Sequence, residues 1–224
     1  MNFDQFKIVS EVIRSRKTKK VLTTEAASEP QEVTRQADEL LSECIATAGW
    51  APFHYDRGMN GIREPWRFHI LSKPACVELA SELPDLASLK PESKLPQLLQ
   101  GCSTLVLVTW IPQFGKNTEQ NFKIDDDKMR QVNEEHLAAT AAASQNLLLL
   151  AQSLKWDSYW ASGGILGQET VLDRLGISCD ERVLSAIFLR YSQMSSQHAT
   201  IISGKHREHR SDSKLWCQRI HSLK

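Results

Sequence analysis

The chain has 224 residues, five cysteines, and 27 basic against 27 acidic side chains, so its formal net charge is zero. We expect residues 1–224 to form a single domain, and a neutral chain has no global attraction to nucleic acid or to anionic membranes. The scattered, odd-numbered cysteines indicate free thiols in a reducing compartment, and the N-terminus lacks the long apolar core of a signal peptide. Both features predict a cytoplasmic protein.

The first fifty residues predict two amphipathic helices joined by a polar segment. Residues 2–15 carry apolar side chains at helical spacing, and the pattern returns over residues 36–50, where Ala51-Pro52 stops it. Residues 23–36 are polar and are expected to form a loop. The first helix ends in a cluster of cations, namely Arg14, Arg16, Lys17, Lys19 and Lys20.

Two apolar runs in the next sixty residues predict strands. The first, residues 66–72, follows a loop at residues 53–64. The second, residues 103–111, is continuous and rich in β-branched side chains, which predicts burial on both faces. Between them we expect a helix over residues 73–83, and the prolines of residues 84–101 allow only a short further helix.

A long helix is expected after a polar connection at residues 112–127. Residues 137–154 contain no charged side chain and are rich in Ala and Leu, which favours a helix. Because their apolar side chains lie on every face, the helix is expected to be buried all round. Its marginal length and its interrupting polar side chains argue against a membrane span.

The last third of the chain predicts two strands and a short helix. The strands are residues 158–160 and 183–191, and the helix is residues 168–175, with Gly176 placed for a left-handed cap. The tail from Ser203 is basic and rich in histidine. Helices take the larger share of this mixture, which predicts an α+β protein with a small sheet packed between helices.

The basic segment from Arg14 to Lys20 has three possible roles. Closely spaced cations with the hydroxyl of Thr18 suit a phosphate, which accepts bidentate bonds from arginine and bonds from hydroxyl groups. A solvated basic helix face would have the same composition. A nucleic-acid surface is a third reading, which the neutral net charge weakens.

Two other stretches allow a structural and a functional reading. Ser162-Gly163-Gly164 follows a short strand, and such glycines either form a plain turn or let the backbone approach a ligand closely. Ala51-Pro52-Phe53-His54 and Glu64-Pro65-Trp66-Arg67-Phe68 could equally hold a structural histidine and a packed tryptophan.

The tail contains side chains of the types that bind zinc, but their spacing matches no usual structural site. We therefore expect a basic tail and no metal ion. The side chains are those of His206, His209, Asp212, Cys217 and His221.

Taken together, these stretches resemble the nitroreductase family of flavin-dependent oxidoreductases, over nearly the whole chain. Residues 13–22 lie without a gap on an opening motif like IRSRRSVRKF, and residues 51–54 and 64–68 match the family's AP and EPW…RF segments. Residues 141–160 are similar to its AAAxQNLLLAAxxLGLGSxW helix. The segment from Leu175 to Tyr191 resembles its last core strand, and Arg207 to Trp216 its closing RRPLEEVVRW.

The resemblance implies a nitroreductase-like fold: a small, mostly antiparallel sheet flanked by helices, with a long buried central helix. It also implies an obligate homodimer with two FMN sites at the subunit interface. The implied activity is the reduction of nitroaromatic or quinone-like acceptors with NAD(P)H by ping-pong hydride transfer, with no dedicated catalytic side chain because the flavin carries the chemistry.

The resemblance also assigns roles to individual residues. It implies that Arg16, Lys17 and Thr18 contact the phosphate and ribityl chain, and that Lys20 lies near the N1–O2 edge of the flavin. Gly163 and Gly164 would offer backbone N–H groups to the N5–O4 edge. The remaining expected contacts are Arg207 and Lys205, which would reach the phosphate, and Pro52, Phe53 and His54 of the partner subunit, which would line the flavin.

The chain departs from the family pattern at several positions. The segment between His54 and Glu64 is longer than usual and lies where substrate would approach. Lys155 and Asp157 stand where the family usually has glycines, Leu22 replaces an aromatic residue, and His209 replaces the tail proline. These departures leave an alternative function open, in which residues 55–63 cover the flavin of a specialised or non-catalytic flavin-binding protein.

Overall fold

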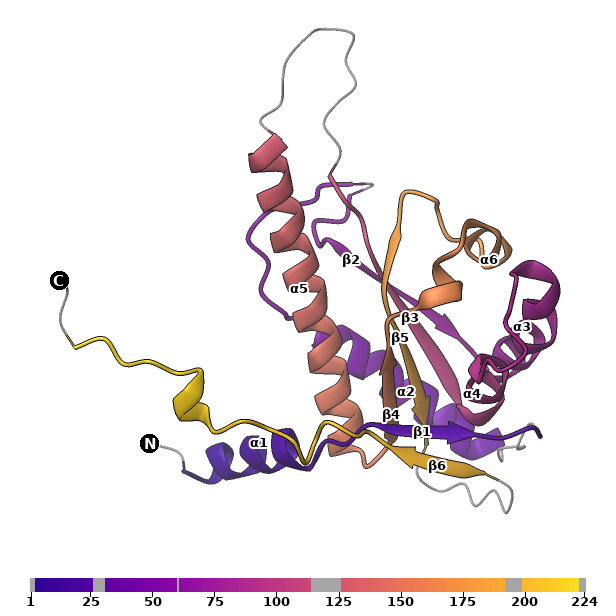
Figure 1. The fold of residues 1–224 in the computed structure, drawn as a ribbon, viewed down its shortest axis with the longest axis horizontal. Coiled ribbons are helices and arrows are strands. Elements are labelled where there is room, and N and C mark those ends of the chain that lie inside the picture. Colours follow the sequence, from indigo (N-terminus) through magenta and orange to yellow (C-terminus); the bar gives the residue numbers. More distant parts are fainter. Residues whose placement is uncertain (1–2, 26–30, 60, 114–125, 192–198, 222–224) are drawn as a thin grey trace, which may run out of the picture.

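The computed structural model describes residues 3–25, 31–59, 61–113, 126–191 and 199–221. Helices and strands are mixed along the chain and form a central sheet with helices on both faces (Figure 1). Most of the polar connection predicted for residues 112–127 lies outside the described residues. The α+β fold with a small antiparallel sheet is therefore as predicted.

Four strands form the central sheet, and every neighbouring pair is antiparallel. The second strand in space, β3, is buried on both faces from Thr104 to Thr109, as its continuous apolar run predicts. Its partner β5 carries a register shift opposite Val108 and Thr109. In spatial order the strands are β2 (Trp66–Leu71), β3 (Thr104–Trp110), β5 (Arg182–Arg190) and β4 (Asp157–Ala161).

Helices cover the two faces of this sheet separately. One face packs against α3 (Lys73–Leu86), α4 (Leu95–Gly101) and α6 (Glu169–Arg174), with Leu105 and Leu107 of β3 at the centre of the cluster. The other face packs against α2 (Gln31–Ala48) and α5 (Asp126–Ser153). Side chains that alternate along β3 and β5 thus supply two apolar cores, one on each side.

Helices α2 and α3 extend beyond their predicted boundaries. Helix α2 begins at Gln31, inside the stretch predicted to be a loop, and α3 continues through Pro84 to Leu86. Gly176 has φ +67°, and Ile177 N–H donates to the Leu172 carbonyl at 2.9 Å, so the predicted left-handed cap closes α6.

The central helix α5 is buried along one side only, which corrects the expectation of burial all round. Its buried residues repeat every three or four positions and face the sheet: Val132, His136, Ala139, Thr140, Ala143, Ser144, Leu147, Leu148 and Ala151. On the other side Gln145 is exposed, and Leu137 is 37% exposed. Apolar side chains such as Leu137 therefore remain exposed on this side of α5 in the single chain.

The two ends of the chain lie side by side at the edge of the molecule (Figure 1). Helix α1 (Phe3–Ser15) leads into β1 (Lys19–Leu22), which pairs antiparallel with β6 (Thr200–Ser203). Neither strand was predicted, because the basic segment resembled a helix end. The tail continues past β6 and contains the 3₁₀ turn η2 (Ser213–Leu215).

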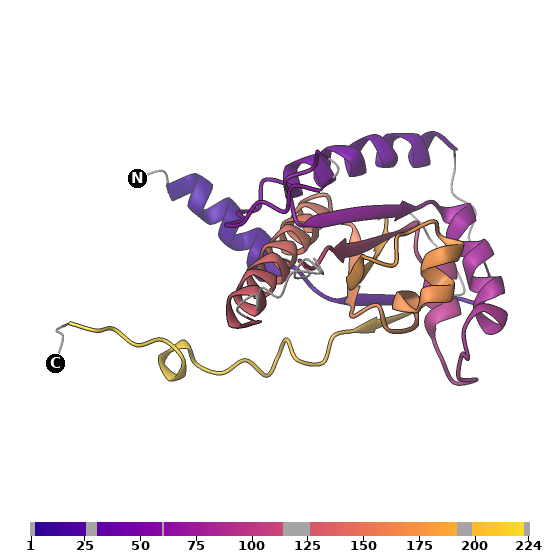
Figure 2. The same cartoon turned by 90° about the horizontal axis from the view of Figure 1, so that it is seen from above.

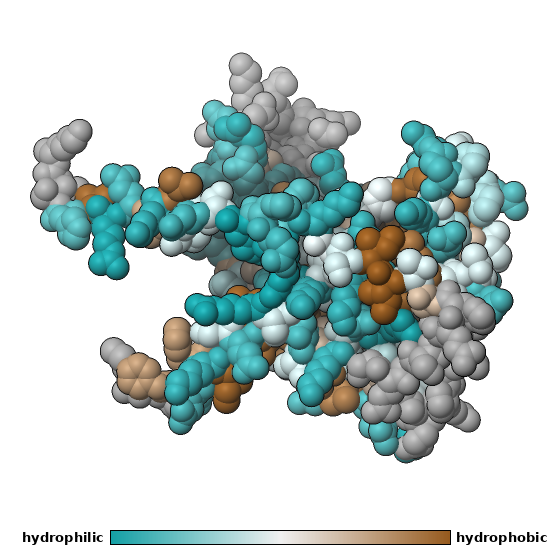
Figure 3. Space-filling model, turned by 60° about the horizontal axis from the view of Figure 1, so that its bottom comes forward, coloured by the Kyte–Doolittle hydropathy of each residue, from teal (hydrophilic) through white to brown (hydrophobic). Residues whose placement is uncertain are grey.

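Helix α1 and the tail project from the body as two arms. No residue of α1 is buried, and its Phe6 is 68% exposed, while Trp216 of the tail is 73% exposed. Figure 3 shows both arms reaching in the same direction with an open hollow between them. Such large exposed apolar side chains on extended arms indicate a surface made for contact with another molecule.

All five cysteines are free, three of them buried and two exposed. Within the described part of the chain, no helix has the length and apolar character needed to cross a membrane.

Candidate functional site

The basic segment lies where the two chain ends meet. Thr18 and Gly204 extend the β1–β6 pairing, because Gly204 N–H donates to the Thr18 carbonyl at 3.1 Å. A Cβ atom at Gly204 would lie 2.9 Å from the Cβ of Thr18, so glycine allows this close approach. The pairing places the residues after Ser203 beside the end of α1.

The same segment also lies beside β4. Thr18 and Ser158 form a parallel β-bridge. The ammonium of Lys19 lies 2.5 Å from the Asp157 carboxylate, and that of Lys20 lies 4.6 Å from the centre of the Tyr159 ring. The structure therefore brings Thr18 and Lys20 next to the strand that leads to Gly163.

Arginine side chains from both chain ends converge at this place. Arg207 donates from Nη1 to the Arg16 carbonyl at 2.6 Å and from Nη2 to the Arg14 carbonyl at 2.5 Å. Burial lowers the pKa of the Arg16 guanidinium, and the positive charges of Arg210 and Arg207 lower it further. Lys17, next to Arg16 in the sequence, and Lys205, two residues before Arg207, are both exposed.

The carboxylate that forms an ion pair with this cationic cluster is that of the exposed Glu208, with an oxygen 3.9 Å from Arg207 Nε. In the described residues no acidic side chain forms an ion pair with Arg16 or with Arg210. Guanidinium groups that repel one another and have no acidic partner suit a dianion such as a phosphate, which takes up several of their N–H groups. Arg210 was not among the residues predicted to bind, although its place in the basic tail sequence could have suggested it.

The glycine pair forms the turn between β4 and the short 3₁₀ helix η1 (Gly164–Gly167). Gly163 and Gly164 have φ +84° and +53°, and a Cβ atom at Gly163 would lie 2.4 Å from Cγ1 of Val183. No acceptor in the described residues takes the N–H of either glycine. The turn therefore leaves two backbone donors without an acceptor among the described residues, at positions that carry no side chain.

An open depression of about 650 Å³ lies beside this turn. Its lining is mostly polar and comes from η1, α6 and the start of β5: Ser162, Gly164, Gly167, Glu169, Leu172, Cys179, Glu181, Arg182 and Val183.

The segment Pro52–His54 lies elsewhere in the single chain. The Phe53 ring meets the Trp66 ring edge-on at 5.7 Å and packs in a cluster with Ala139 and Ala143 of α5. Figure 2 shows α2 and the loop after it on one side of α5, and β6 and the tail on the other. Within one chain, α5 therefore lies between this segment and the basic cluster.

The long loop at residues 55–63 contains internal backbone hydrogen bonds. Met59 and Ile62 exchange backbone hydrogen bonds of 3.1 Å around Gly61, whose φ is +77°. Arg57 donates from Nε to the Ile111 carbonyl and from Nη2 to the Pro112 carbonyl, both at 3.1 Å. The loop is therefore fixed to the end of β3, and Asn60 lies outside the described residues.

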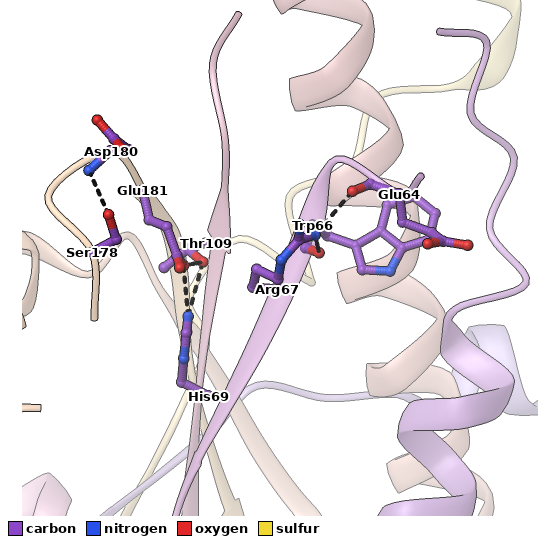
Figure 4. A network of polar contacts seen from close by, with 8 residues as sticks. All are labelled: Glu64, Trp66, Arg67, His69, Thr109, Ser178, Asp180 and Glu181. Atoms are coloured by element: carbon purple, nitrogen blue, oxygen red, sulfur yellow. Dashed lines mark hydrogen bonds and ion pairs between the residues drawn. The ribbon is translucent and has the colours of Figure 1, made fainter. Parts of the chain in front are cut away.

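A second polar cluster, not foreseen from the sequence, joins β2, β3 and the start of β5 (Figure 4). His69 Nε2 lies 2.6 Å from Glu181 Oε2 and 3.1 Å from Thr109 Oγ1, and Thr109 donates to the same carboxylate oxygen. Burial alone would raise the pKa of Glu181, but the hydrogen bonds from His69 and Thr109, with the charges of His69 and Arg67, hold this pKa below its usual value.

Metal binding finds no support in the described residues. They contain no group of three or more His, Cys, Asp and Glu side chains close enough to hold an ion. The tail side chains of the right types, His206, His209, Asp212, Cys217 and His221, are all exposed.

Comparison with known proteins identifies the fold. The sequence model of the nitroreductase family matches residues 34–189. No curated protein matches the chain. A nitroreductase-like protein from Bacillus cereus has a TM-score of 0.64 at 20% identity, with 96% of each chain covered.

Two further solved structures carry cofactor names. A putative nitroreductase in complex with FMN from Desulfovibrio desulfuricans has a TM-score of 0.56 at 21% identity, covering 96% of this chain and 98% of that one. A putative NAD(P)H:FMN oxidoreductase from Staphylococcus epidermidis has a TM-score of 0.59 at 16% identity, with 95% of each chain covered. At these identities the likeness establishes the fold alone.

We expect Gly163→Ala to destabilise the protein by about 2–4 kcal/mol, because the added methyl group overlaps Val183 and the residue must keep a positive φ. Urea unfolding measures the change. Gly167→Ala is the matched control, since its Cβ would lie 3.5 Å from the Val183 Cβ, an ordinary contact. Val183→Ala in the Gly163→Ala background should recover the part caused by overlap. Equal effects of Gly163→Ala and Gly167→Ala would contradict this account.

We expect Glu181→Gln to lower stability by about 1–2 kcal/mol at pH 7, because it removes a charged partner of His69 and Thr109. The folded-state pKa of Glu181 lies below the unfolded one, so its contribution is present above the unfolded pKa and is lost as pH falls through the folded pKa. Unfolding curves from pH 7 to pH 3 should therefore converge at the acidic end. Glu169→Gln, at an exposed carboxylate of the same depression, is the control. A difference that stays constant with pH would refute the assignment.

Proposed function

Because the chain belongs to the nitroreductase family, we propose that it is an FMN-dependent oxidoreductase that uses NADH or NADPH to reduce nitroaromatic or quinone-like acceptors by a ping-pong mechanism. Residues 1–224 act as one FMN-binding domain in this proposal. When bound, the flavin supplies the hydride chemistry, and the protein supplies binding, orientation and electrostatics.

One observation carries the proposal: arginines from both chain ends gather beside the strand that leads to Gly163 and Gly164, and Arg16 has no acidic partner among the described residues. Arg207 contacts the main chain of Arg16, and Thr18 forms a bridge to Ser158 of β4. A molecule with a phosphate at one end and a flat, hydrogen-bonding edge at the other fits both features. FMN has this shape and these groups.

The residues take the following roles in the proposal. Arg16, Lys17 and Thr18 bind the phosphate and the ribityl chain, and Lys205 and Arg207 complete this part of the site from the tail. Lys20 lies along the N1–O2 edge, where a cation stabilises the negative charge of the reduced ring. Gly163 and Gly164 donate to the N5–O4 edge and orient the ring without covering its face.

The proposal includes a homodimer with the flavin at the subunit interface. The open side of α5, the arm α1 and the tail residue Trp216 leave apolar surface uncovered in one chain. Trp50, just before the Pro52–His54 segment, is 88% exposed. A second copy would cover these surfaces and bring its Pro52, Phe53 and His54 to the flavin, which one chain places on the far side of α5.

A second candidate is a specialised or non-catalytic flavin-binding protein of the same fold. The observation in its favour is the ordered loop at residues 55–63, which follows His54 directly and is held by Arg57 to the end of β3. In a dimer such a loop could cover the flavin face where nicotinamide and acceptor must approach. Reduction by NAD(P)H separates the two candidates.

We expect the purified protein to be yellow, with an oxidised-flavin absorption spectrum that NADH or NADPH bleaches and a quinone acceptor restores. Anaerobic absorption spectroscopy measures each half-reaction separately, as a ping-pong mechanism requires. A flavin that neither nicotinamide reduces would favour the second candidate. A colourless protein that takes up no added FMN would refute both.

We expect the protein to sediment as a dimer, and the double change Leu215→Ala with Trp216→Ala to weaken its self-association about ten- to a hundredfold, because two exposed apolar side chains lose a partner surface. Sedimentation equilibrium measures the constant. Lys214→Ala, at an exposed polar position of the same turn, is the control. A wild-type monomer at all concentrations would rule out the shared site.

A further inference from the structure

The residues just after strand β3 form a junction where several parts of the chain meet. Ile111 N–H donates to the Pro65 carbonyl at 3.1 Å, which joins the junction to the start of β2. Gln113 N–H donates to Asn133 Oδ1 of α5 at 2.7 Å, and Asn133 Nδ2 donates to the Gln113 carbonyl at 3.0 Å. Residues 111–113, which we call the β3-end junction, are therefore fixed to both β2 and α5.

The loop at residues 55–63 reaches the same junction through the side chain of Arg57. Its Nε and Nη2 atoms donate to two successive carbonyls, those of Ile111 and Pro112, each at 3.1 Å. The N–H of Arg57 donates to the Arg63 carbonyl at 2.8 Å, across the base of the loop. Arg57 thus holds the base of the loop to the β3-end junction.

A buried histidine of α5 lies one turn from this junction. His136 follows Asn133 by three residues, so both side chains lie on the same face of the helix. His136 is 1% exposed, and its Nε2 atom is buried without a hydrogen-bond partner among the described residues. Buried polar atoms are nearly always paired, so an unpaired one needs a physical explanation.

The surroundings of His136 suit a neutral imidazole and oppose a charged one. Burial lowers the pKa of His136, and the positive charge of Arg57 lowers it further. An imidazolium at this place would be a buried cation with an unpaired N–H group close to a guanidinium. The contacts that hold the loop therefore depend on the protonation state of His136.

The charged residues of the neighbouring elements leave Arg57 as the group that acts on His136. Strand β2 packs Trp66 and Phe68 toward α5, so Arg67 and His69 point to the opposite face of the sheet. Strand β3 has no charged residue, and the described charged side chains of α2 are exposed. Other charged residues of α5 near His136 and of β5 are exposed or lie at the far end of the strand: Glu134, Glu135, Arg182 and Arg190.

We propose that the β3-end junction is a pH-sensitive latch, in which Arg57 holds the loop in place while His136 is neutral and protonation of His136 releases the loop. The inference rests on the proposed flavin site and adds a regulation to it, because the loop directly follows His54. The rings of His54 and Tyr55 are in edge-on contact at 4.6 Å, so displacement of the loop disturbs the segment assigned to the flavin.

The direction of the pH effect follows from the lowered pKa of His136. Release of the loop exposes the imidazole to water and restores its ordinary pKa of about 6.5, so opening takes up a proton. The equilibrium constant for opening should therefore rise up to about tenfold for each pH unit below the ordinary pKa, until the lowered pKa is reached. At higher pH, opening should not depend on pH.

Amide hydrogen exchange of flavin-free full-length protein between pH 8 and pH 5, corrected for the intrinsic chemical rate, tests the latch. The reporters are the amides of Arg57 and Gln113, whose acceptors lie across the loop base and across the junction. Wild type should exchange faster at acidic pH, and His136→Gln should lose this dependence because no titrating group remains. His209→Gln, at an exposed histidine of the tail, is the control and should behave as wild type. Equal pH dependence in wild type and His136→Gln would overturn the latch.

Arg57 variants test the anchor independently of pH. Arg57→Ala should speed exchange at Gln113 already at pH 8, and Arg57→Lys should recover part of the protection. Arg63→Ala is the matched control, since it removes an exposed ion pair of the same loop, 2.7 Å from Asp56, and leaves the anchor intact. Equal effects of Arg57→Ala and Arg63→Ala on Gln113 would contradict the role of Arg57.

The imidazole pKa of His136 in wild type, measured by NMR, keeps the proposal testable if His136→Gln does not fold. A pKa below the ordinary histidine value is expected. A pKa at or above that value would overturn the latch, because protonation would then cost nothing in the closed loop.

Flavin titrations separate this inference from the proposed function. FMN affinity should fall at acidic pH in wild type and fall less in His136→Gln, and equal losses in both would overturn the link between latch and flavin site. A loop that responds to pH in a protein that binds no flavin would retain the latch and refute the FMN assignment. Flavin binding by a protein whose Gln113 exchange ignores pH would retain the assignment and refute the latch.

Discussion

The candidate site depends on the pairing of β1 with β6. Arg16 and Arg207 are 191 residues apart in the sequence, and only this pairing brings their segments together. A two-stranded ribbon is marginal alone, so its neighbours must hold it. Gly101 of α4 packs so closely on β1 that a Cβ atom there would lie 2.2 Å from the Val21 carbonyl oxygen, and Leu22 belongs to the core beneath. The position of the cations is therefore set by core packing.

That packing is stable despite an electrostatic cost. Arg16 is half-buried near two other guanidinium groups, and both burial and like charge disfavour its charged form. Part of the cost is offset where Arg207 meets the end of α1, because a cation is favourable there. The remainder has no counterpart among the described residues. Uncompensated charges of this kind are typical of functional sites, and an anionic ligand would compensate that of Arg16.

Sequence patterns predicted the elements whose structure depends mainly on residues close together in the chain. The strand at residues 103–111, the long helix over residues 137–154 and the cap at Gly176 follow from composition, periodicity and backbone preference. Strands β1 (KKVL) and β6 (TIIS) were not predicted, because each is a strand only through its pairing with the other. Lys155 has φ +59° in the turn after α5, where the family usually has glycine, and no rule of residue type predicts a lysine there.

The site residues also divide into those with a signal in the sequence and those without one. Motif resemblance alone singled out Arg207, whereas Gly163 was also marked by its place after a short strand, and the roles of both toward FMN stay predictions. The cluster of His69, Thr109 and Glu181 had no signal in the sequence, because 112 residues separate His69 from Glu181 and each type is common on a half-exposed sheet face.

The side of α5 that one chain leaves open connects the fold to the proposed chemistry. It carries exposed apolar side chains, and the segment Pro52–His54 lies across α5 from the cationic cluster. If that segment lines the flavin, it must come from a second chain, and the surface that this chain covers is the open side of the helix. Dimer formation and completion of the flavin site are then one event. Flavin affinity and self-association must therefore be thermodynamically linked, each strengthening the other by the same factor.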